Sequence, residues 1–174
     1  MKHRILFVCH GNICRSTMAE YVMRELASRA GARERVLVDS AATSQEEVGN
    51  DVHPGTRRVL AREGIPCGHH RSRQMGPADY ERFDYLVGMD AENLAGMYRL
   101  LSGEKGYGWS WDPVSPDQAR RADPLGKVSL LMDWTGAPRD VADPWYTGDF
   151  DATFRDVYAG CSALLQRLLS QSPE

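Results

Sequence analysis

Short apolar runs alternate with longer amphipathic stretches along this chain. Four of the runs are rich in Val, Leu, Ile and Phe, which is typical of strands that are buried on both faces of a sheet. Each run is also short, as such strands usually are. The runs predict strands at residues 4–9, 36–40, 83–89 and 128–132.

The stretches between these runs have helical spacing. Apolar residues recur every three or four positions over 18–26, over 94–101 and, most clearly, over 154–168. A proline at 54 suits the first turn of a further helix, which the glycine at 64 would end. Strands that alternate with helices pair in parallel through right-handed crossovers. The pattern therefore predicts an open α/β fold, a four-stranded parallel sheet with helices on both faces.

Residues 102–126 depart from this rhythm, because they hold Gly, Pro, Asp and aromatic residues without a clear period. Loops inside compact domains seldom exceed roughly 12–15 residues. We therefore interpret this segment as an insertion in a single domain that spans 1–174. It connects a helix to the next strand, which places it at the amino edge of the sheet. This position argues against a lid, so we expect Tyr107, Trp109 and Trp111 to fold onto the body of the domain or to meet a partner or a second copy.

Composition and charge narrow the function only a little. Apolar residues make up 42% of the 174 residues, which suits a globular domain, and the net charge of -3 gives no reason to expect nucleic acid as a partner. The longest apolar run, 5–9, is far too short to span a bilayer, and no small-residue cleavage site follows it. We therefore expect a cytoplasmic protein whose four cysteines are thiols.

The candidate chemistry gathers in residues 8–16, where the first predicted strand ends and a helix begins. Free N–H groups and the dipole at a helix N-terminus favour an anion there. Gly11 and Asn12 allow backbone angles that other residues avoid, so several amides can turn inward. Arg15 adds a planar fork of donors that matches phosphate oxygens. Cys9 would lie at the floor, where positive charge favours the nucleophilic thiolate.

A core role or a metal site fits this loop less well than an anion site does. Cys9 and Cys14 could be two buried core thiols, since free cysteine is often buried. The loop lacks the Gly and Lys pattern of a nucleotide-binding P-loop. Cys9 and Cys14 lack zinc spacing, and the His69–His70 pair has no matching cysteines. The sequence therefore predicts neither a metal nor a cofactor.

The run at 8–16 resembles the signature of the low-molecular-weight protein tyrosine phosphatases. The resemblance continues in order over nearly the whole chain outside the insertion, through the runs at 39–44, 64–66, 73–74, 83–85, 89–90 with 93–94, and 143–146. It implies a Rossmann-like phosphatase sandwich that hydrolyses protein phosphotyrosine or a small aryl phosphate through a phosphocysteine.

The resemblance also implies roles for individual residues. Cys9 would be the nucleophile, Arg15 would bind the phosphate and the transition state, and Ser16 would hydrogen-bond the thiolate. The whole phosphate-binding loop would then comprise His10, Gly11, Asn12, Ile13, Cys14, Arg15 and Ser16. The family supports this loop through an Asn, a Ser and a His, which correspond to Asn12, Ser40 and His69.

Phosphoryl transfer also needs an acid for the leaving oxygen and a base for water. Three Asp-Pro pairs are candidates, since Asp-Pro fixes a turn. Asp112 and Asp123 precede the last predicted strand and so lie at the edge away from Cys9. Asp143 follows that strand and returns to the reactive edge, so we predict that it is the general acid and base. Trp145 and Tyr146 follow it and would flank an aryl phosphate as the pocket wall.

Three other functions share this fold and loop. Arginine phosphatases tend to carry Thr where this chain has Ile13, so phosphotyrosine is favoured. Arsenate reductases need further cysteines after the third strand, and 90–118 contain none. A non-catalytic phosphopeptide-binding module would not need both the thiol and Asp143.

Two departures from the family pattern stand out. Acidic residues, among them Glu46, follow position 44, where the family often has an aromatic residue at the pocket wall. They are either a solvated acidic turn or a wall that repels acidic substrates and accepts basic flanking residues. His53 and Gly55 surround Pro54 in place of the usual Asp-Pro-Arg, a change expected to affect only the local helix cap.

We also expect Cys14 to be the redox partner of Cys9, forming a disulfide after peroxide oxidises the thiolate.

Overall fold

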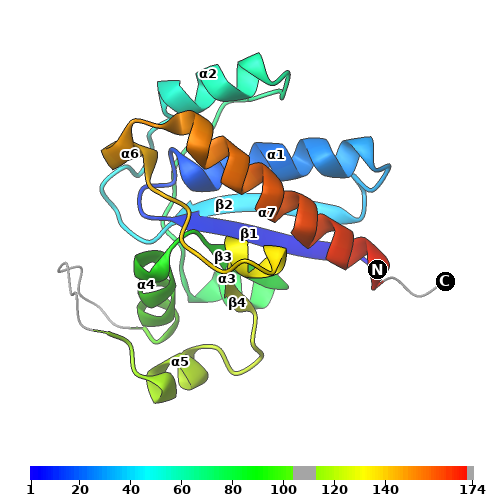
Figure 1. The fold of residues 1–174 in the computed structure, drawn as a ribbon. Helices are drawn as coiled ribbons and strands as arrows, with labels where there is room; N and C mark the ends of the chain where they lie inside the picture. Colours follow the sequence, from blue (N-terminus) through cyan, green and yellow to red (C-terminus); the bar gives the residue numbers. More distant parts are fainter. Residues whose placement is uncertain (104–112, 172–174) are drawn as a thin grey trace.

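The computed structural model describes residues 1–103 and 113–171. Within these residues a four-stranded parallel sheet has the order β2-β1-β3-β4, with helices on both faces (Figure 1). The strands are β1 (His3–Cys9), β2 (Val36–Ala42), β3 (Tyr85–Gly88) and β4 (Val128–Leu130). Cys9 is level with Ala42 in the β1–β2 pairing. The predicted open α/β sheet is confirmed.

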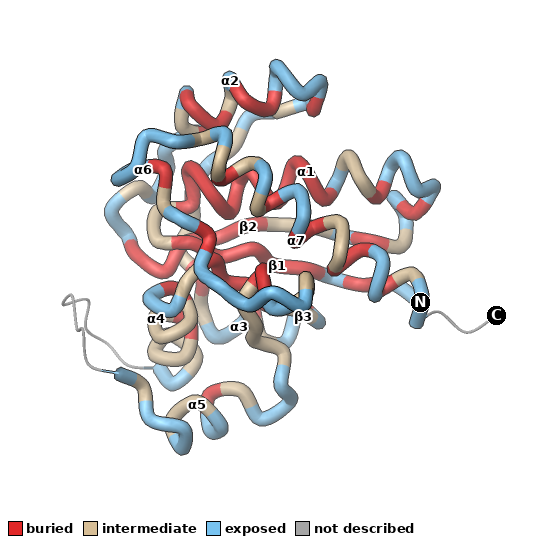
Figure 2. Tube along the Cα trace, viewed as in Figure 1, coloured by how far each residue is buried: buried red, intermediate tan, exposed pale blue. Residues whose placement is uncertain are grey.

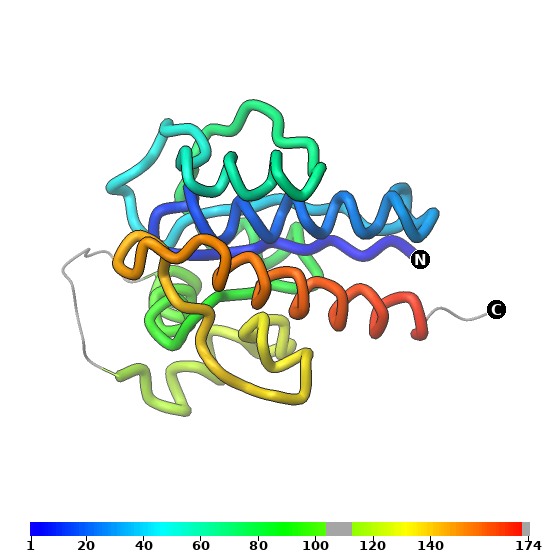
Figure 3. Tube along the Cα trace, turned by 45° about the horizontal axis from the view of Figure 1, so that its top comes forward, coloured from blue at the N-terminus to red at the C-terminus, as the bar shows by residue number. Residues whose placement is uncertain are grey.

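The first face of the sheet carries the two longest helices. These are α1 (Arg15–Arg29) and α7 (Phe150–Ser170), which run side by side (Figures 1 and 3), with α2 (Pro54–Arg62) outside them. The opposite face is covered by α3 (Pro77–Arg82) and α4 (Ala91–Leu101). A 3-10 helix, η1 (Leu131–Thr135), follows β4 and packs against α7.

The alternation of β1 divides the core of the described residues between these faces. Ile5, Phe7 and Cys9 belong to the cluster that packs under α1 and α7, whereas Leu6 and Val8 belong to the cluster on the α4 side. Because successive side chains of a strand point to opposite faces, a continuous apolar run serves both clusters. Figure 2 shows β1 and the start of α1 buried along most of their length. Cys9 therefore lies at the end of a strand that is packed on both faces.

The structure corrects several expected element bounds. The last strand ends at Leu130, because Leu131 and Met132 turn into η1 and are buried there. The third strand begins at Tyr85, since Phe83 is the residue that ends α3. Short helices such as α3 have too few residues for an apolar period to be visible in the sequence.

The segment 102–126 is not irregular throughout, contrary to expectation. A short helix, α5 (Pro116–Ala122), begins with a capping box formed by Ser115 and Gln118 and packs on α4. Asp123 then accepts hydrogen bonds from the backbone N–H groups of Lys127 and Val128, at the start of β4. Asp112 and the three aromatic residues predicted to form a partner surface lie outside the described residues. No helix among the described residues has the length and apolarity of a membrane span.

Candidate active site

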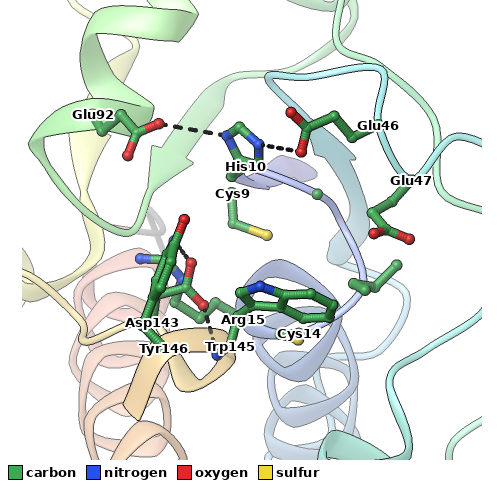
Figure 4. A pocket seen from close by; sticks show the side chains of 12 residues that line it. Cys9, His10, Cys14, Arg15, Glu46, Glu47, Glu92, Asp143, Trp145 and Tyr146 are labelled. Atoms are coloured by element: carbon green, nitrogen blue, oxygen red, sulfur yellow. Dashed lines mark hydrogen bonds and ion pairs between the residues drawn. The ribbon is translucent and has the colours of Figure 1, made fainter. Parts of the chain in front are cut away.

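A pocket lies at the carboxyl edge of the sheet, where β1 passes into α1 (Figure 4). Its floor is the loop from Cys9 to Cys14, and its sides come from the segment after β2, the start of α4 and the segment at α6 (Pro144–Thr147). In open parallel sheets, ligands bind beyond the carboxyl ends of the strands. The pocket is therefore where the sequence predicted it.

The carbonyl oxygens of this loop face away from the pocket. They accept hydrogen bonds from side chains and backbone outside the loop, at 2.8 Å in each case: Gly11 from Ser72, Asn12 from His70, and Ile13 from His53 N–H. Because the C=O and N–H of a trans peptide point in opposite directions, the following N–H groups turn toward the pocket. One of them, Asn12 N–H, donates to Cys9 Sγ at 3.3 Å. The loop thus presents amides to an anion.

Asn12 and Gly11 achieve this turn in different ways. Asn12 adopts φ 57°, the left-handed conformation that asparagine tolerates better than most residues. Gly11 does not have positive φ. A Cβ at Gly11 would lie 3.1 Å from Cγ of Glu47, a close contact that the Glu47 side chain would have to shift to accept.

A directed chain of hydrogen bonds ends at the Cys9 sulfur. Ser40 Oγ donates to the Glu20 carboxylate and accepts from Asn12 Nδ2 at 2.9 Å. Asn12 Nδ2 also donates to Ser16 Oγ at 2.9 Å. The Ser16 hydroxyl proton is then free for Cys9 Sγ, 3.0 Å away. Because the Glu20 carboxylate accepts from Ser40, each later group in the chain is oriented by the one before it, and the Ser16 hydroxyl is left to donate to the Cys9 sulfur.

The supporting histidine is His70, so the prediction of His69 is wrong by one residue. His70 Nε2 lies 2.8 Å from Asn12 O, whereas His69 is exposed. The two adjacent histidines have the same local sequence signal. What separates them is the hydrogen bond that His70 makes to the loop and its lower exposure.

Arg15 is held beneath the pocket with its side chain 2% exposed. Its guanidinium donates to Asp90 at 2.6 Å, to Val141 O at 2.9 Å and to Asp143 at 3.0 Å. Burial acts to lower the pKa of Arg15, but the charges of Cys9, Asp90 and Asp143 outweigh it and raise that pKa above its ordinary value. Arg15 is therefore a fixed cation whose direction is set by two carboxylates.

Asp143 lies at the pocket, and Asp123 does not. The Asp143 carboxylate accepts from Trp145 N–H at 3.0 Å, which caps α6, and it also pairs with Arg15. Asp123 accepts from the Tyr80 hydroxyl at 2.6 Å, next to the start of β4. The topology argument that separated these two Asp-Pro pairs thus agrees with their positions.

Trp145 and Tyr146 stand beside the pocket and are largely exposed, at 59% and 76% (Figure 4). Neighbouring exposed rings of this size form an apolar patch of the kind that contacts a ligand or a partner. Their position next to Asp143 gives the pocket an aromatic side that a flat aryl group could contact.

The opposite side of the pocket is acidic. Glu46 lies 3.0 Å from Nε2 of His10, and Glu92 lies 3.5 Å from Nδ1 of the same ring, so that His10 is held between two carboxylates above Cys9 (Figure 4). Glu47 also lines the pocket. We call Glu46, Glu47 and Glu92 the acidic rim.

The cysteines differ in their surroundings, and all four are free thiols. Cys9, 3% exposed, is the one that accepts a loop amide. Burial first, and the neighbouring Cys9 second, raise the pKa of the Cys14 thiol well above its ordinary range. Burial alone raises the pKa of Cys161 in the same way, in the core under α7. Cys67 is half-buried beside Arg57.

Among the residues in contact with this site that sequence reasoning missed, three carry a carboxylate. Glu20 lies four residues after Ser16, so both stand on one face of α1, a spacing that could have indicated their coupling. Asp90 closely follows β3, and Glu92 stands in the first turn of α4, which places both at the carboxyl edge with Cys9. No group of three or more His, Cys, Asp or Glu within the described ranges could hold a metal ion.

A parallel α/β fold with a buried thiol in an amide-lined loop is the arrangement expected of a cysteine-dependent phosphatase. The sequence model of one family, described as low molecular weight phosphotyrosine protein phosphatase, matches residues 4–106. The chain belongs to this family.

Individual relatives agree over almost the full length. The chain is 36% identical over 163 residues to the low molecular weight protein-tyrosine-phosphatase YfkJ of Bacillus subtilis, with 92% of both chains covered. It is 32% identical to the human low molecular weight phosphotyrosine protein phosphatase, with 94% of each covered. The crystal structure of YfkJ superposes with a TM-score of 0.83 at 31% identity, covering 99% of this chain and 98% of that one. An arginine phosphatase from Drosophila superposes with a TM-score of 0.77 at 26% identity, covering 99% and 100%.

Proposed function

We propose that this protein hydrolyses phosphotyrosine in proteins, with Cys9 as nucleophile, Arg15 as phosphate ligand and Asp143 as general acid and base. The observation that carries the proposal is the Cys9 sulfur itself. It receives the Asn12 N–H and faces the Ser16 hydroxyl at the floor of a loop whose amides point inward. Such donors stabilise a thiolate and, above it, the oxygens of a phosphate group.

In the first step the Cys9 thiolate attacks phosphorus and a P–S bond forms. The P–O bond to the tyrosine breaks, and its electron pair goes to the phenol oxygen, which takes a proton from Asp143. Arg15 and the loop amides hold the phosphoryl oxygens throughout, because donors that are already in place need no reorganisation as charge shifts. Ser16, Asn12, Ser40 and His70 keep the loop in this geometry.

In the second step water attacks the phosphocysteine. The Asp143 carboxylate takes a proton from that water, the P–S bond breaks, and the electron pair returns to Cys9 as thiolate. The Ser16 hydroxyl then donates to the departing sulfur, which makes the thiolate a better leaving group. Inorganic phosphate leaves, and Asp143 is protonated again for the next cycle.

A substrate panel tests this function. We expect turnover of an aryl phosphate and a phosphotyrosine peptide, little turnover of phosphoarginine, no effect of a chelator, and inhibition by vanadate. The aromatic side formed by Trp145 and Tyr146 supports the preference for an aryl group. If phosphoarginine is the preferred substrate, the protein is an arginine phosphatase instead. If no substrate releases phosphate, the protein is a phosphopeptide-binding module without catalytic activity.

The acidic rim supports a further preference, for basic residues next to the phosphotyrosine. We expect the double substitution Glu46→Gln with Glu47→Gln to lower kcat/KM about twofold to fivefold for a peptide with Lys or Arg flanks, because the interaction free energy of an exposed ion pair corresponds to about this factor. The same substitutions should raise kcat/KM for a peptide with acidic flanks. The difference should shrink with added salt.

A matched control for the rim is Glu34→Gln, which removes an exposed carboxylate away from the pocket. It should leave the ratio of the two peptides unchanged. An equal response of both peptides to the rim substitutions would contradict the charge preference.

We also propose that Cys14 protects Cys9 from irreversible oxidation. Peroxide would oxidise the Cys9 thiolate to a sulfenic acid and release hydroxide, and the Cys14 thiol would then displace water from that sulfenic acid to form a disulfide. Peptide mapping after peroxide should show Cys9 joined to Cys14, and Cys14→Ser should recover poorly with added thiol, unlike the control Cys67→Ser. Full recovery of Cys14→Ser would remove Cys14 from this role.

Free thiols fit a reducing compartment, so we propose that the protein acts in the cytoplasm.

The insertion at 102–126 stays a proposed surface for a partner or a second copy. Its described end, α5, packs on α4 ahead of β4. The whole chain is proposed to act as one phosphatase domain.

A further inference from the structure

His53, the residue just before α2, contacts the phosphate loop, the start of α2, Phe150 and Trp145. Its backbone N–H donates to Ile13 O in the phosphate loop at 2.8 Å. Its ring Nδ1 accepts from Gly55 N–H at 3.0 Å and so caps α2. The ring stacks on Phe150, with centroids 5.0 Å apart and planes 15° apart, and meets the indole of Trp145 edge to face at 5.9 Å and 79°.

The position of Phe150, on which the His53 ring stacks, depends on Gly55. A Cβ at Gly55 would lie 2.4 to 2.6 Å from three atoms of the Phe150 ring, closer than any real side chain allows. Phe150 therefore occupies space that the glycine leaves, at the start of α7. His53 lies on it and is held at once by α2 and by α7, two helices that themselves pack together.

Trp145 has little else to fix its ring. Its backbone is set by the hydrogen bond to Asp143, but its side chain lines the pocket and is largely exposed. Among the residues that the structure describes, His53 provides the one aromatic contact to this indole. An exposed indole would otherwise move between rotamers.

We propose that His53 is a positioning residue, which holds Trp145 at a fixed place relative to the phosphate loop so that the pocket favours aryl over alkyl phosphates. The inference deepens the proposed function and rests on it for the identity of the substrate. One residue bonds to the phosphate loop and contacts the aromatic side. It therefore sets the distance between phosphate and ring that a bound aryl phosphate must match.

Two substitutions of His53 separate its role in capping α2 from the contact of its ring with Trp145. His53→Asn keeps an acceptor for Gly55 N–H and the backbone bond to Ile13, but it removes the ring. His53→Phe keeps a ring and removes the acceptor. Binding of benzylphosphonate and methylphosphonate, measured by calorimetry, then reports on aryl and phosphoryl contacts without turnover.

We expect His53→Asn to weaken benzylphosphonate binding about threefold to tenfold, because the free energy of one aromatic contact corresponds to about this factor. Binding of methylphosphonate should weaken less than twofold. His53→Phe should keep both affinities within about twofold of wild type while lowering the Tm. In a Trp145→Ala background, His53→Asn should have no further effect on benzylphosphonate. Gly55→Ala, which displaces Phe150, should act in the same direction as His53→Asn.

Equal weakening of both phosphonates, no change in either, or an undiminished effect without Trp145 would each overturn this role for His53. The proposed function is tested separately by turnover of the wild type. A wild type that shows the benzylphosphonate pattern but no hydrolysis of aryl phosphate would keep the role of His53 in binding and overturn the function alone.

Discussion

Cys9→Ser should abolish turnover of every phosphate ester while leaving affinity for inorganic phosphate within a few-fold of wild type. The hydroxyl replaces the thiol with little change in shape, but an alkoxide does not form at neutral pH as a thiolate does. The Asn12 amide and the other inward N–H groups stay in place, and so does Arg15, which Asp90 and Val141 hold independently of the sulfur. Steady-state rates and calorimetry measure the two effects.

Cys67→Ser is the matched control, because Cys67 lies outside the pocket and is half-buried. Its rate should equal that of wild type. Activity of Cys9→Ser within tenfold of wild type would rule out Cys9 as nucleophile. Loss of phosphate binding as well would mean that the sulfur is needed to hold the loop together.

Asp143→Asn should slow hydrolysis of esters with poor leaving groups by about 10²–10⁴-fold, the usual contribution of general acid catalysis. Asparagine caps a helix as well as aspartate does, so the hydrogen bond from Trp145 N–H and the start of α6 should persist. The ester of an acidic phenol needs no proton to leave, and the first step with this ester should be nearly unaffected. The measurement compares leaving groups of different pKa in wild type and variant.

Asp123→Asn serves as the control for this prediction. Asp123 accepts hydrogen bonds from Tyr80 and from two amides at the start of β4, so the variant should lose stability, by about 1–3 kcal/mol, without losing catalysis. A loss that is equal for good and poor leaving groups in Asp143→Asn would indicate a structural role for Asp143.

The sheet and the position of the loop that follows β1 could be predicted from the sequence because both depend on local patterns. Residues 4–9 and 154–168 bury their apolar side chains where period and length indicate. The loop from Cys9 to Arg15 is continuous in sequence, and Asn12 takes the left-handed angle that its side chain tolerates. Asp143 could be chosen by topology, since a parallel sheet brings the carboxyl ends of all its strands to one edge.

Long-range pairings were not predictable in the same way. Glu20 reaches Ser40 because α1 packs on β2, and Asp90 reaches Arg15 because β3 pairs with β1, and no local signal in the sequence describes either contact. His69 and His70 are adjacent residues of the same type, and only the long-range hydrogen bond from His70 to Asn12 O distinguishes them. From the sequence, His53 was expected to affect only the local helix cap. Its contact with Trp145 joins residues that are far apart in the sequence, so no local pattern could predict it.

The most direct test of the mechanism is detection of phosphate on Cys9 during turnover. Asp143→Asn with the ester of an acidic phenol should form the phosphocysteine at nearly the normal rate but hydrolyse it slowly, because the base for water is missing. A denaturing quench followed by peptide mass mapping should then find phosphate on the peptide that contains Cys9, together with a stoichiometric burst of phenol. Phosphate on another residue, or phenol release with no burst and no phosphopeptide, would contradict a mechanism that proceeds through Cys9.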